Sequence, residues 1–314
     1  MRFLMLFLFI FFISFSFSLL IFSLNFSFAS YSESDYQLQL RWGTEGTENG
    51  EFMIPHSMVF DSEGNIYVTD RENHRIQKFT SDGMFITKWG TEGSGDGEFS
   101  FPEGIDVDSH GNVYVADTGN NRIQKFNSDG KFITKWGTEG SGDGEFSSHA
   151  HGVTKDSFDN IYITDRFNNN VQKFTSDGKF ITKWGTFGNG SGQFNEPHSS
   201  IIDRHGNVYV SDMNNHRVQK FTSDGKFITK WGTEGNEDGE FRLPLGIGID
   251  SKGHIFIIDQ ATSSINQFSN EGKFLNKINF NFGSLEDIEI DSNDKIYVTD
   301  RNKNEILKFS KLSN

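Results

Sequence analysis

The chain has 314 residues, no cysteine, 33 glycines and a formal net charge of −14 at pH 7. The lack of cysteine excludes a disulfide framework and thiol chemistry, and the acidity argues against nucleic-acid binding, which draws its affinity from Lys and Arg on phosphates. The roughly 280 residues after the apolar N-terminus are enough for one domain that buries about 75% of its unfolded surface without cross-links.

The N-terminus has the composition of an export signal. Arg2 precedes an apolar run over residues 3–24, and residues 27–29 offer the small side chains that a signal peptidase reads. Because the run approaches the length of a membrane span, residues 1–29 are predicted to be a signal peptide or an uncleaved membrane anchor, followed by a linker over 30–35. Either alternative predicts a protein outside the cytoplasm, secreted or anchored to the outer side of the cell membrane, whose membrane contact is confined to residues 3–24.

Residues 36–314 are built from a repeated unit. The tryptophans recur every 47 or 48 residues, at Trp42, Trp89, Trp136, Trp184 and Trp231. An aspartate that ends a YVTD-like run marks six units, at Asp70, Asp117, Asp165, Asp212, Asp259 and Asp300. Apolar residues alternate with period two in four segments of each unit, which predicts four short strands a to d with Gly-containing hairpins between a and b and between c and d. Since one such sheet cannot bury both faces, the sequence predicts an all-β, six-bladed β-propeller.

The two ends of the domain complement each other. Residues 36–42 match the fourth strand of the other units, whereas the last unit ends after its third strand. The N-terminal strand is therefore predicted to complete the last blade, which leaves the ring without an open edge. The replacement of the blade tryptophan by Ile278, followed by a short loop, predicts an irregular junction between blades five and six.

The stretches FPEGIDVD, NVYVADTGNNRIQKF and GKFITKWGTEGSGDGEF resemble the NHL repeat family, and the resemblance covers residues 36–314. It implies the same six-bladed propeller. It does not imply one function, because the family includes RNA-binding domains, receptor ectodomains, sensor domains and a few lyases. Without cysteine, the chain lacks the RING and B-box modules of the family's ubiquitin ligases.

The regularly repeated Asp and Arg side chains are predicted to be structural. Each Asp that ends a b strand is followed five residues later by an Arg in three units, at Arg75, Arg122 and Arg217. A pair that recurs so regularly is expected to close the b-to-c turn of its own blade.

Acidic residues concentrate in the loops from strand d to the next strand a, as in Glu92, Asp96 and Glu98. These loops share a rim with the b-to-c loops, so one face is predicted to be negative, either as a solvated rim or as a binding surface. The first functional hypothesis is a non-catalytic, monomeric module that binds a protein, peptide or glycan on this face. Its predicted contact residues are Arg71, Asn73, His74, Arg166, Asn168, Asn169, Asn214, Asn215 and His216.

The residues that open the six a strands suggest a second hypothesis. Around the ring these residues are His56, Glu103, His151, His198, Leu245 and Glu286. Because a strands are innermost in a propeller, the side chains should surround the axial channel, where they either line its mouth around water or bind one divalent metal, zinc or calcium. The predicted ligands are His56, His151 and His198, with Glu103 and Glu286 nearby.

The segments IPHSMVF, AHGVTKD and EPHSSIID are similar to those that hold zinc in the peptidyl-hydroxyglycine α-amidating lyases of the family. This resemblance implies a catalytic role for Arg71, or for Arg166 or Arg301 at the same place in other blades, in stabilising alkoxide charge. The chain departs from the lyases in the blades that carry the histidines, in the missing tyrosine two residues after a blade Asp, and in the lack of disulfides. The second hypothesis is therefore broader: a metal-dependent lyase or hydrolase, amidating-lyase-like, gluconolactonase-like or streptogramin-lyase-like.

Overall fold

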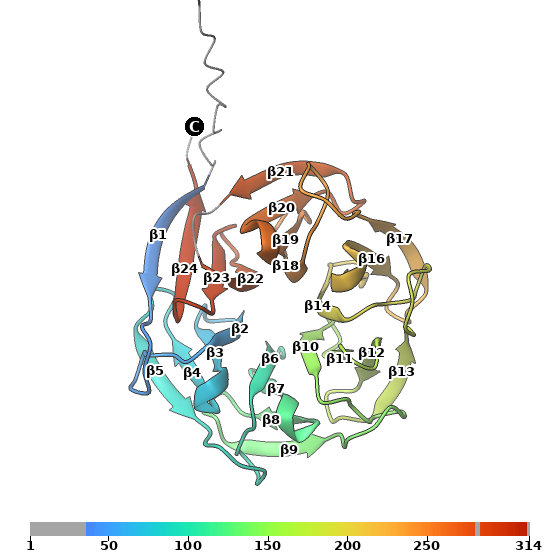
Figure 1. Cartoon of the computed structure of the whole chain (residues 1–314). Coiled ribbons are helices and arrows are strands. Elements are labelled where there is room, and N and C mark those ends of the chain that lie inside the picture. Colours follow the sequence, from blue (N-terminus) through green and yellow to red (C-terminus); the bar gives the residue numbers. More distant parts are fainter. Residues whose placement is uncertain (1–35, 280–282, 313–314) are drawn as a thin grey trace, which may run out of the picture. The chain divides into compact units, whose positions relative to one another are not determined.

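A computed structural model describes residues 36–279 and 283–312, which form six antiparallel sheets of four strands around a common axis (Figure 1). The prediction of a six-bladed β-propeller is thus confirmed. The predicted leader, residues 1–29, the linker and residues 280–282 of the expected irregular junction lie outside the described residues. Among the described residues there is no helix of a length and hydropathy that would cross a membrane.

Each of the first three blades runs from the innermost strand to the outermost in chain order. Blade one comprises β2 (Pro55–Phe60), β3 (Ile66–Asp70), β4 (Arg75–Phe79) and β5 (Phe85–Trp89). Blade two comprises β6 (Pro102–Val107), β7 (Val113–Asp117), β8 (Arg122–Phe126) and β9 (Phe132–Trp136). Blade three comprises β10 (Ala150–Lys155), β11 (Ile161–Asp165), β12 (Asn170–Phe174) and β13 (Phe180–Trp184).

The next two blades repeat this order, and the last recruits its outer strand from the N-terminus. Blade four comprises β14 (Pro197–Ile202), β15 (Val208–Asp212), β16 (Arg217–Phe221) and β17 (Phe227–Trp231). Blade five comprises β18 (Pro244–Ile249), β19 (Ile255–Asp259), β20 (Ser264–Phe268) and β21 (Phe274–Asn279). Blade six comprises β22 (Leu285–Ile290), β23 (Ile296–Asp300), β24 (Glu305–Lys311) and β1 (Tyr36–Trp42). Short 3-10 helices follow four of the second strands: η1 (Arg71–Asn73), η2 (Thr118–Asn120), η3 (Met213–Asn215) and η4 (Gln260–Thr262).

The N-terminal strand closes the ring as predicted. β1 pairs antiparallel with β24, with Tyr36 opposite Lys311 and Trp42 opposite Ile306, and the two strands lie side by side in Figure 1. Because this pairing covers the backbone edge of β24, the first and last described segments of the domain are held together by the same sheet.

The blades pack on one another through aromatic side chains from strands b, c and d. Trp89, at the end of β5, contacts Tyr67 of its own blade and Phe126 of the next, with ring centroids 6.0 and 5.8 Å apart. The turn between β8 and β9 lies against the same indole at Gly130, whose φ is +79°. This contact repeats around the ring, so each tryptophan joins two blades, which explains the 47-residue spacing of the sequence.

The repeated Asp and Arg side chains are structural. Asp117 is fully buried and accepts hydrogen bonds from Arg122 Nε at 2.6 Å and from the backbone N–H of Ser100 at 2.7 Å. The same guanidinium donates to the carbonyl oxygens of Ser94 and Glu98 in the preceding d-to-a loop. The structural role is as predicted, but the Arg holds the d-to-a loop that leads into strand a of its own blade and does not only close the b-to-c turn. The same contacts recur at Arg75 and Arg217, so the pair fixes where strand a begins in three blades.

Candidate functional site

The six a strands β2, β6, β10, β14, β18 and β22 surround the axis of the ring (Figure 1). Each begins with a β-bulge, as in β6, where Pro102 pairs with Asp117 but the next paired residue is Ile105 opposite Val115. The bulge breaks the strict alternation of side chains. As a result the second residue of the strand, Glu103 in β6, lies buried at one end of the axial channel.

The three histidines that open β2, β10 and β14 converge at that end of the channel. His56, His151 and His198 are only 4%, 5% and 3% exposed. The ring centroids of His151 and His198 lie 3.8 Å apart, and those of His56 and His151 lie 4.8 Å apart. The structure thus brings together imidazoles from three blades that are separated by more than 40 residues in the chain.

Two carboxylates complete the cluster. Glu286 Oε1 lies 3.1 Å from His198 Nε2 and 3.4 Å from His56 Nε2. Glu103 Oε2 lies 3.9 Å from His151 Nε2 and has no hydrogen-bond partner within the described residues. We call His56, Glu103, His151, His198 and Glu286 the His–Glu cluster. Leu245, at the same position in β18, is buried beside it and supplies no ligand.

The cluster contains two groups whose ligand atoms all lie within 4.8 Å of one another, His56–Glu103–His151 and His151–His198–Glu286. Two ligands on one tetrahedral zinc ion with bonds of about 2.1 Å lie about 3.4 Å apart, so small side-chain movements would bring either group onto one ion. The Nδ1 atoms of the three histidines are buried and have no hydrogen-bond partner within the described residues. The donor set and its unpaired atoms therefore fit a zinc-type ion.

The protonation states of the cluster suit metal ligands. Burial lowers the pKa of His56, and burial together with the neighbouring His198 and His56 lowers that of His151 well below its usual value. Burial alone would raise the pKa of Glu286, but the hydrogen bond from His198 and the charges of His56 and Arg301 outweigh it and lower the pKa. The lowered pKa values favour the neutral imidazole at His56 and His151 and the ionised carboxylate at Glu286, which are the forms that bind metal.

Arginines hold both carboxylates from the side of the b-to-c loops. Arg71 Nε donates to Glu103 Oε1 at 2.9 Å, and Arg301 Nη1 donates to Glu286 Oε2 at 3.1 Å. Arg166, which the sequence also offers as a catalytic candidate, pairs instead with Glu196, its Nε lying 2.8 Å from Oε2. Arg71 and Arg301 therefore belong to the site as partners of its carboxylates, whereas Arg166 makes no such contact within the described residues.

A cavity of about 540 Å³ extends from the His–Glu cluster along the axis. Its walls are the six a strands, and its far end is formed by the a-to-b turns, at Asp61, Ser109 and Ser292. In the described part of the chain no residue of the b-to-c loops lines it. The cavity thus reaches the cluster from the face opposite the acidic loops.

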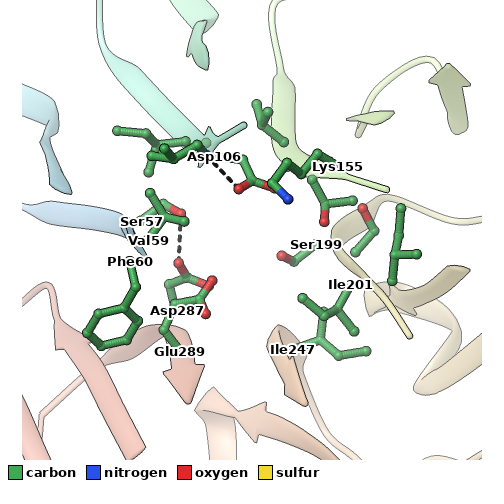
Figure 2. A pocket seen from close by; sticks show the side chains of 18 of the residues that line it. Ser57, Val59, Phe60, Asp106, Lys155, Ser199, Ile201, Ile247, Asp287 and Glu289 are labelled. Carbon is green, nitrogen blue, oxygen red and sulfur yellow. Dashed lines mark hydrogen bonds between the residues drawn. The ribbon is translucent and has the colours of Figure 1, made fainter. Parts of the chain in front are cut away.

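Polar side chains deeper in this cavity were not identified from the sequence. Figure 2 shows Asp106 and Lys155 on one side of it and Asp287 and Glu289 on the other. Asp106 and Glu289 share the fifth position of the a strand, where blade four has Ile201. In the sequence, Asp106 and Glu289 differ from the other blades only in carrying a carboxylate where most blades have an apolar or small residue. The β-bulge at the start of the strand directs this side chain toward the axis.

The comparisons with known proteins agree with this architecture. The NHL repeat profile matches residues 52–79 and 99–126, and a profile described as a 6-bladed beta-propeller matches residues 149–208 and 204–284. The chain is an NHL-repeat, six-bladed β-propeller. The human NHL repeat-containing protein 3 is 50% identical over 40 residues, which are 13% of this chain and 12% of that protein.

Solved structures share the fold of this NHL propeller at low sequence identity. A streptogramin B lyase superposes with a TM-score of 0.62 at 14% identity, over 88% of this chain and 97% of the other. A gluconolactonase from Xanthomonas campestris, XC5397, superposes with a TM-score of 0.63 at 14% identity, over 83% of this chain and 88% of the other. At these identities the similarity shows the fold alone.

Most of the side chains predicted for the binding face of the NHL propeller have partners within the chain. Asn73, Asn168 and Asn215 each donate both to the Asp of their own b strand and to a carbonyl oxygen of the adjoining d-to-a loop. His74 Nδ1 and Asn169 Oδ1 each accept the backbone N–H that precedes a neighbouring a strand. These residues connect loops and blades, and the prediction that they bind a ligand has no further support in the geometry.

The acidic loops of the NHL propeller divide their carboxylates between two roles. One glutamate in each of four loops folds back onto a backbone N–H three residues earlier, as Glu98 does with Gly95. The others are exposed, among them Glu45, Glu92, Glu139 and Glu234. The rim is therefore both a set of closed loops and an exposed negative surface.

Proposed function

We propose that the protein is a metal-dependent lyase or hydrolase that acts on a small ligand inside the axial cavity. The observation that carries the proposal is the convergence of His56, His151 and His198 with two carboxylates. The three histidines and Glu286 line the inner end of that cavity. A binding module that used a broad surface would need no such buried donor set. By its ligand types the site suits zinc better than calcium, which prefers oxygen ligands alone.

The side chains of the cluster would have distinct roles. His151 and His198, which form one close group with Glu286, would hold the ion, and His56 would complete its coordination. A zinc ion in such a site supplies Lewis-acid polarisation of a substrate oxygen. Glu286, fixed by Arg301 and by the histidine N–H groups, would be a further ligand. Glu103 lies behind His151 and does not itself line the cavity. Its Oε2 has no hydrogen-bond partner within the described residues while Arg71 holds Oε1, so it would accept a proton that reaches it by way of His151 or water.

The low-identity similarity in fold to a streptogramin B lyase and a gluconolactonase is consistent with catalysis on this scaffold. It does not select a reaction, because propellers carry unrelated sites. The proposed reaction class therefore rests on the His–Glu cluster and on the enclosed cavity.

Elemental analysis tests the proposal. The full chain would be purified without a polyhistidine tag and compared with the His56→Ala, His151→Ala, His198→Ala variant. We expect about one zinc or other transition ion per chain in the wild type, in keeping with one four-ligand site, and none in the variant. Equal metal content in both proteins, or none in the wild type at saturating zinc, would overturn the proposal.

The exposed carboxylates of the acidic rim favour a second function, the binding of a basic protein or peptide. Such binding would be weakened by salt, because exposed charges are screened over about 10 Å at 0.1 M ionic strength. A fluorescent Lys-rich peptide should bind the wild type and lose affinity in a variant that carries Glu92→Gln and Glu139→Gln. Binding that is unchanged in this variant would contradict the rim as the contact surface.

We also propose that the protein is exported from the cytoplasm. The composition of residues 1–29 supports export, with the propeller outside the cytoplasm. An N-terminal sequence of the mature protein that begins at or after Ser30 would show cleavage, and one that begins before it would favour the anchored form.

A further inference from the structure

We propose that the inner cavity binds a small organic cation, a ligand with an ammonium group and an apolar body, and that Asp106 and Glu289 recognise the ammonium group. The inference deepens the proposed function, on which it rests for the reaction that follows binding, by naming the chemical class of the substrate. The ligand would enter from the face of the a-to-b turns, opposite the acidic rim.

The first argument is an excess of acidic side chains over cationic ones inside the cavity. Asp106, Asp287 and Glu289 line it together with a single cation, Lys155 (Figure 2). Within the described residues no hydrogen bond or ion pair joins Lys155 Nζ to any of the three carboxylates, although its charge acts on Asp106. A low-dielectric enclosure makes such an imbalance costly, and a bound cation would relieve it.

The two carboxylates assigned to recognition have free acceptor capacity. Asp287 is occupied, since its Oδ2 accepts hydrogen bonds from Ser57 Oγ at 2.6 Å and from the Met58 backbone N–H at 3.0 Å. Asp106 accepts through Oδ1 the backbone N–H of Val107. No side chain among the described residues donates to Glu289, and each carboxylate can accept several hydrogen bonds.

The geometry argues for an organic cation over a second metal ion. The described groups with ligand atoms within 4.8 Å of one another belong to the His–Glu cluster, and none includes Asp106, Asp287 or Glu289. Hard cations require six or more oxygen atoms close to one point. The cavity volume of about 540 Å³ is instead that of a small-molecule pocket.

The cavity walls also carry apolar side chains, which suit the apolar body of the proposed ligand. Val59, Ile201 and Ile247 line the same space (Figure 2), so a hydrocarbon body would be buried beside the carboxylates. At the inner end the cavity meets His151, which is 5% exposed and whose Nδ1 has no partner within the described residues. A ligand anchored at Asp106 and Glu289 would thus extend toward the proposed metal site.

Isothermal titration calorimetry on the full chain, treated with EDTA to remove metal, tests the inference with benzylamine as the probe. Benzyl alcohol has the same shape without the charge, benzoate carries the opposite charge, and calcium chloride tests a simple ion. Glu289→Gln and Asp106→Asn remove the recognising charges, and Glu237→Gln on the exposed rim is the matched control.

We expect saturable 1:1 binding of benzylamine to the wild type. The affinity should be at least about tenfold weaker in Glu289→Gln and in Asp106→Asn, because each variant loses a charge-assisted hydrogen bond to the ammonium group. The affinity of Glu237→Gln should equal that of the wild type. Equal binding of benzyl alcohol, or binding of calcium without benzylamine, would overturn the inference, and both results need only the wild type. Benzylamine binding to a protein that never takes up zinc would keep the inference and remove the proposed metal function. Zinc uptake without benzylamine binding would keep the proposed metal function and overturn the inference.

Discussion

His198 Nε2 lies 3.1 Å from Glu286 Oε1, although the two residues open strands of different blades, β14 and β22. Only closure of the ring brings them together, so the site depends on the whole propeller. We predict that Glu286→Gln weakens zinc binding at least about 10- to 100-fold, which is the loss expected for a group that only supports histidine ligands, because Glu286 is also a proposed ligand. Competition with a chromogenic chelator measures this affinity.

Glu196→Gln provides the matched control for this prediction. Glu196 also pairs with an arginine, Arg166, but contacts no histidine of the His–Glu cluster within the described residues. The zinc affinity of the Glu196→Gln variant should equal that of the wild type. Equal losses in the two variants would mean that the effect comes from general destabilisation.

The second prediction concerns the closure of the ring. Deleting residues 30–42 removes β1, exposes the backbone edge of β24 and removes the contacts of Trp42 with Phe79 and Tyr297. We expect a fall in Tm of about 10 °C or more, since each kcal/mol lost shifts Tm by about 2–4 °C in a domain of this size. Gln37→Ala with Gln39→Ala, on the exposed side of the same strand, should leave Tm within a few degrees. A deletion variant that melts like the wild type would contradict the role of β1.

The fold could be predicted from the sequence because its signals are local and repeated. Each blade carries the same alternation of apolar residues, most blades have the same Gly-containing turns, and five of the six have the same Trp. The unmatched strand at residues 36–42 showed how the ring closes. Repetition also identified the Asp and Arg pairs as structural, because six near-equal copies of Asp117 could not form one active site.

The candidate site could be predicted only in part. The His–Glu cluster was found because all its members open an a strand, and the topology brings all such positions to the axis. Asp106 and Glu289 were missed because a bulge at the start of each a strand alters which side chains face inward, and no residue type marks it. The sequence also gave no sign that Arg301 contacts the cluster while Arg166 does not, since both follow a b-strand Asp.

The third prediction concerns the clamp between Asp117 and Arg122. Arg122→Met would leave the fully buried Asp117 carboxylate without its charged partner and free the carbonyl oxygen of Ser94, while the Glu98 carbonyl oxygen would keep its hydrogen bond from Gln124. Breaking a buried pair in this way costs about 3–5 kcal/mol. Chemical denaturation measures the loss. Asn170→Ala, at the same place in blade three, should cost far less, because Asn170 Oδ1 has no partner to lose within the described residues.

The fourth prediction concerns pH and Asp106. Burial raises the pKa of Asp106 from 3.8 to about 7; Lys155 opposes the rise, while Asp108 adds to it and Glu289 faces the same group. Between these two values the folded protein holds a proton that the unfolded chain has released. The contribution of Asp106 to the free energy of unfolding therefore falls as pH rises from 3.8 to about 7.

Asp106→Asn tests this dependence. Relative to the wild type, the Tm of the variant should increase as the pH is raised from 5 to 8, because the asparagine carries no charge to bury. Asp143→Asn, on the exposed rim, should show a constant difference over the same range. A constant difference for Asp106→Asn as well would mean that the carboxylate is as well solvated in the folded protein as in the unfolded chain.

The fifth prediction separates two costs of replacing a glycine. Gly130 and Gly253 both have positive φ, +79° and +85°, so alanine at either position strains the backbone by about 1–2 kcal/mol. A Cβ at Gly130 would lie 2.5 Å from the ring of Trp89, whereas one at Gly253 would meet no atom within 4 Å. Gly130→Ala should therefore lose about 1–3 kcal/mol more than Gly253→Ala, as overpacking between blades does. Equal losses, measured by chemical denaturation, would show that the indole can move aside and that the Trp contacts do not fix the spacing between blades.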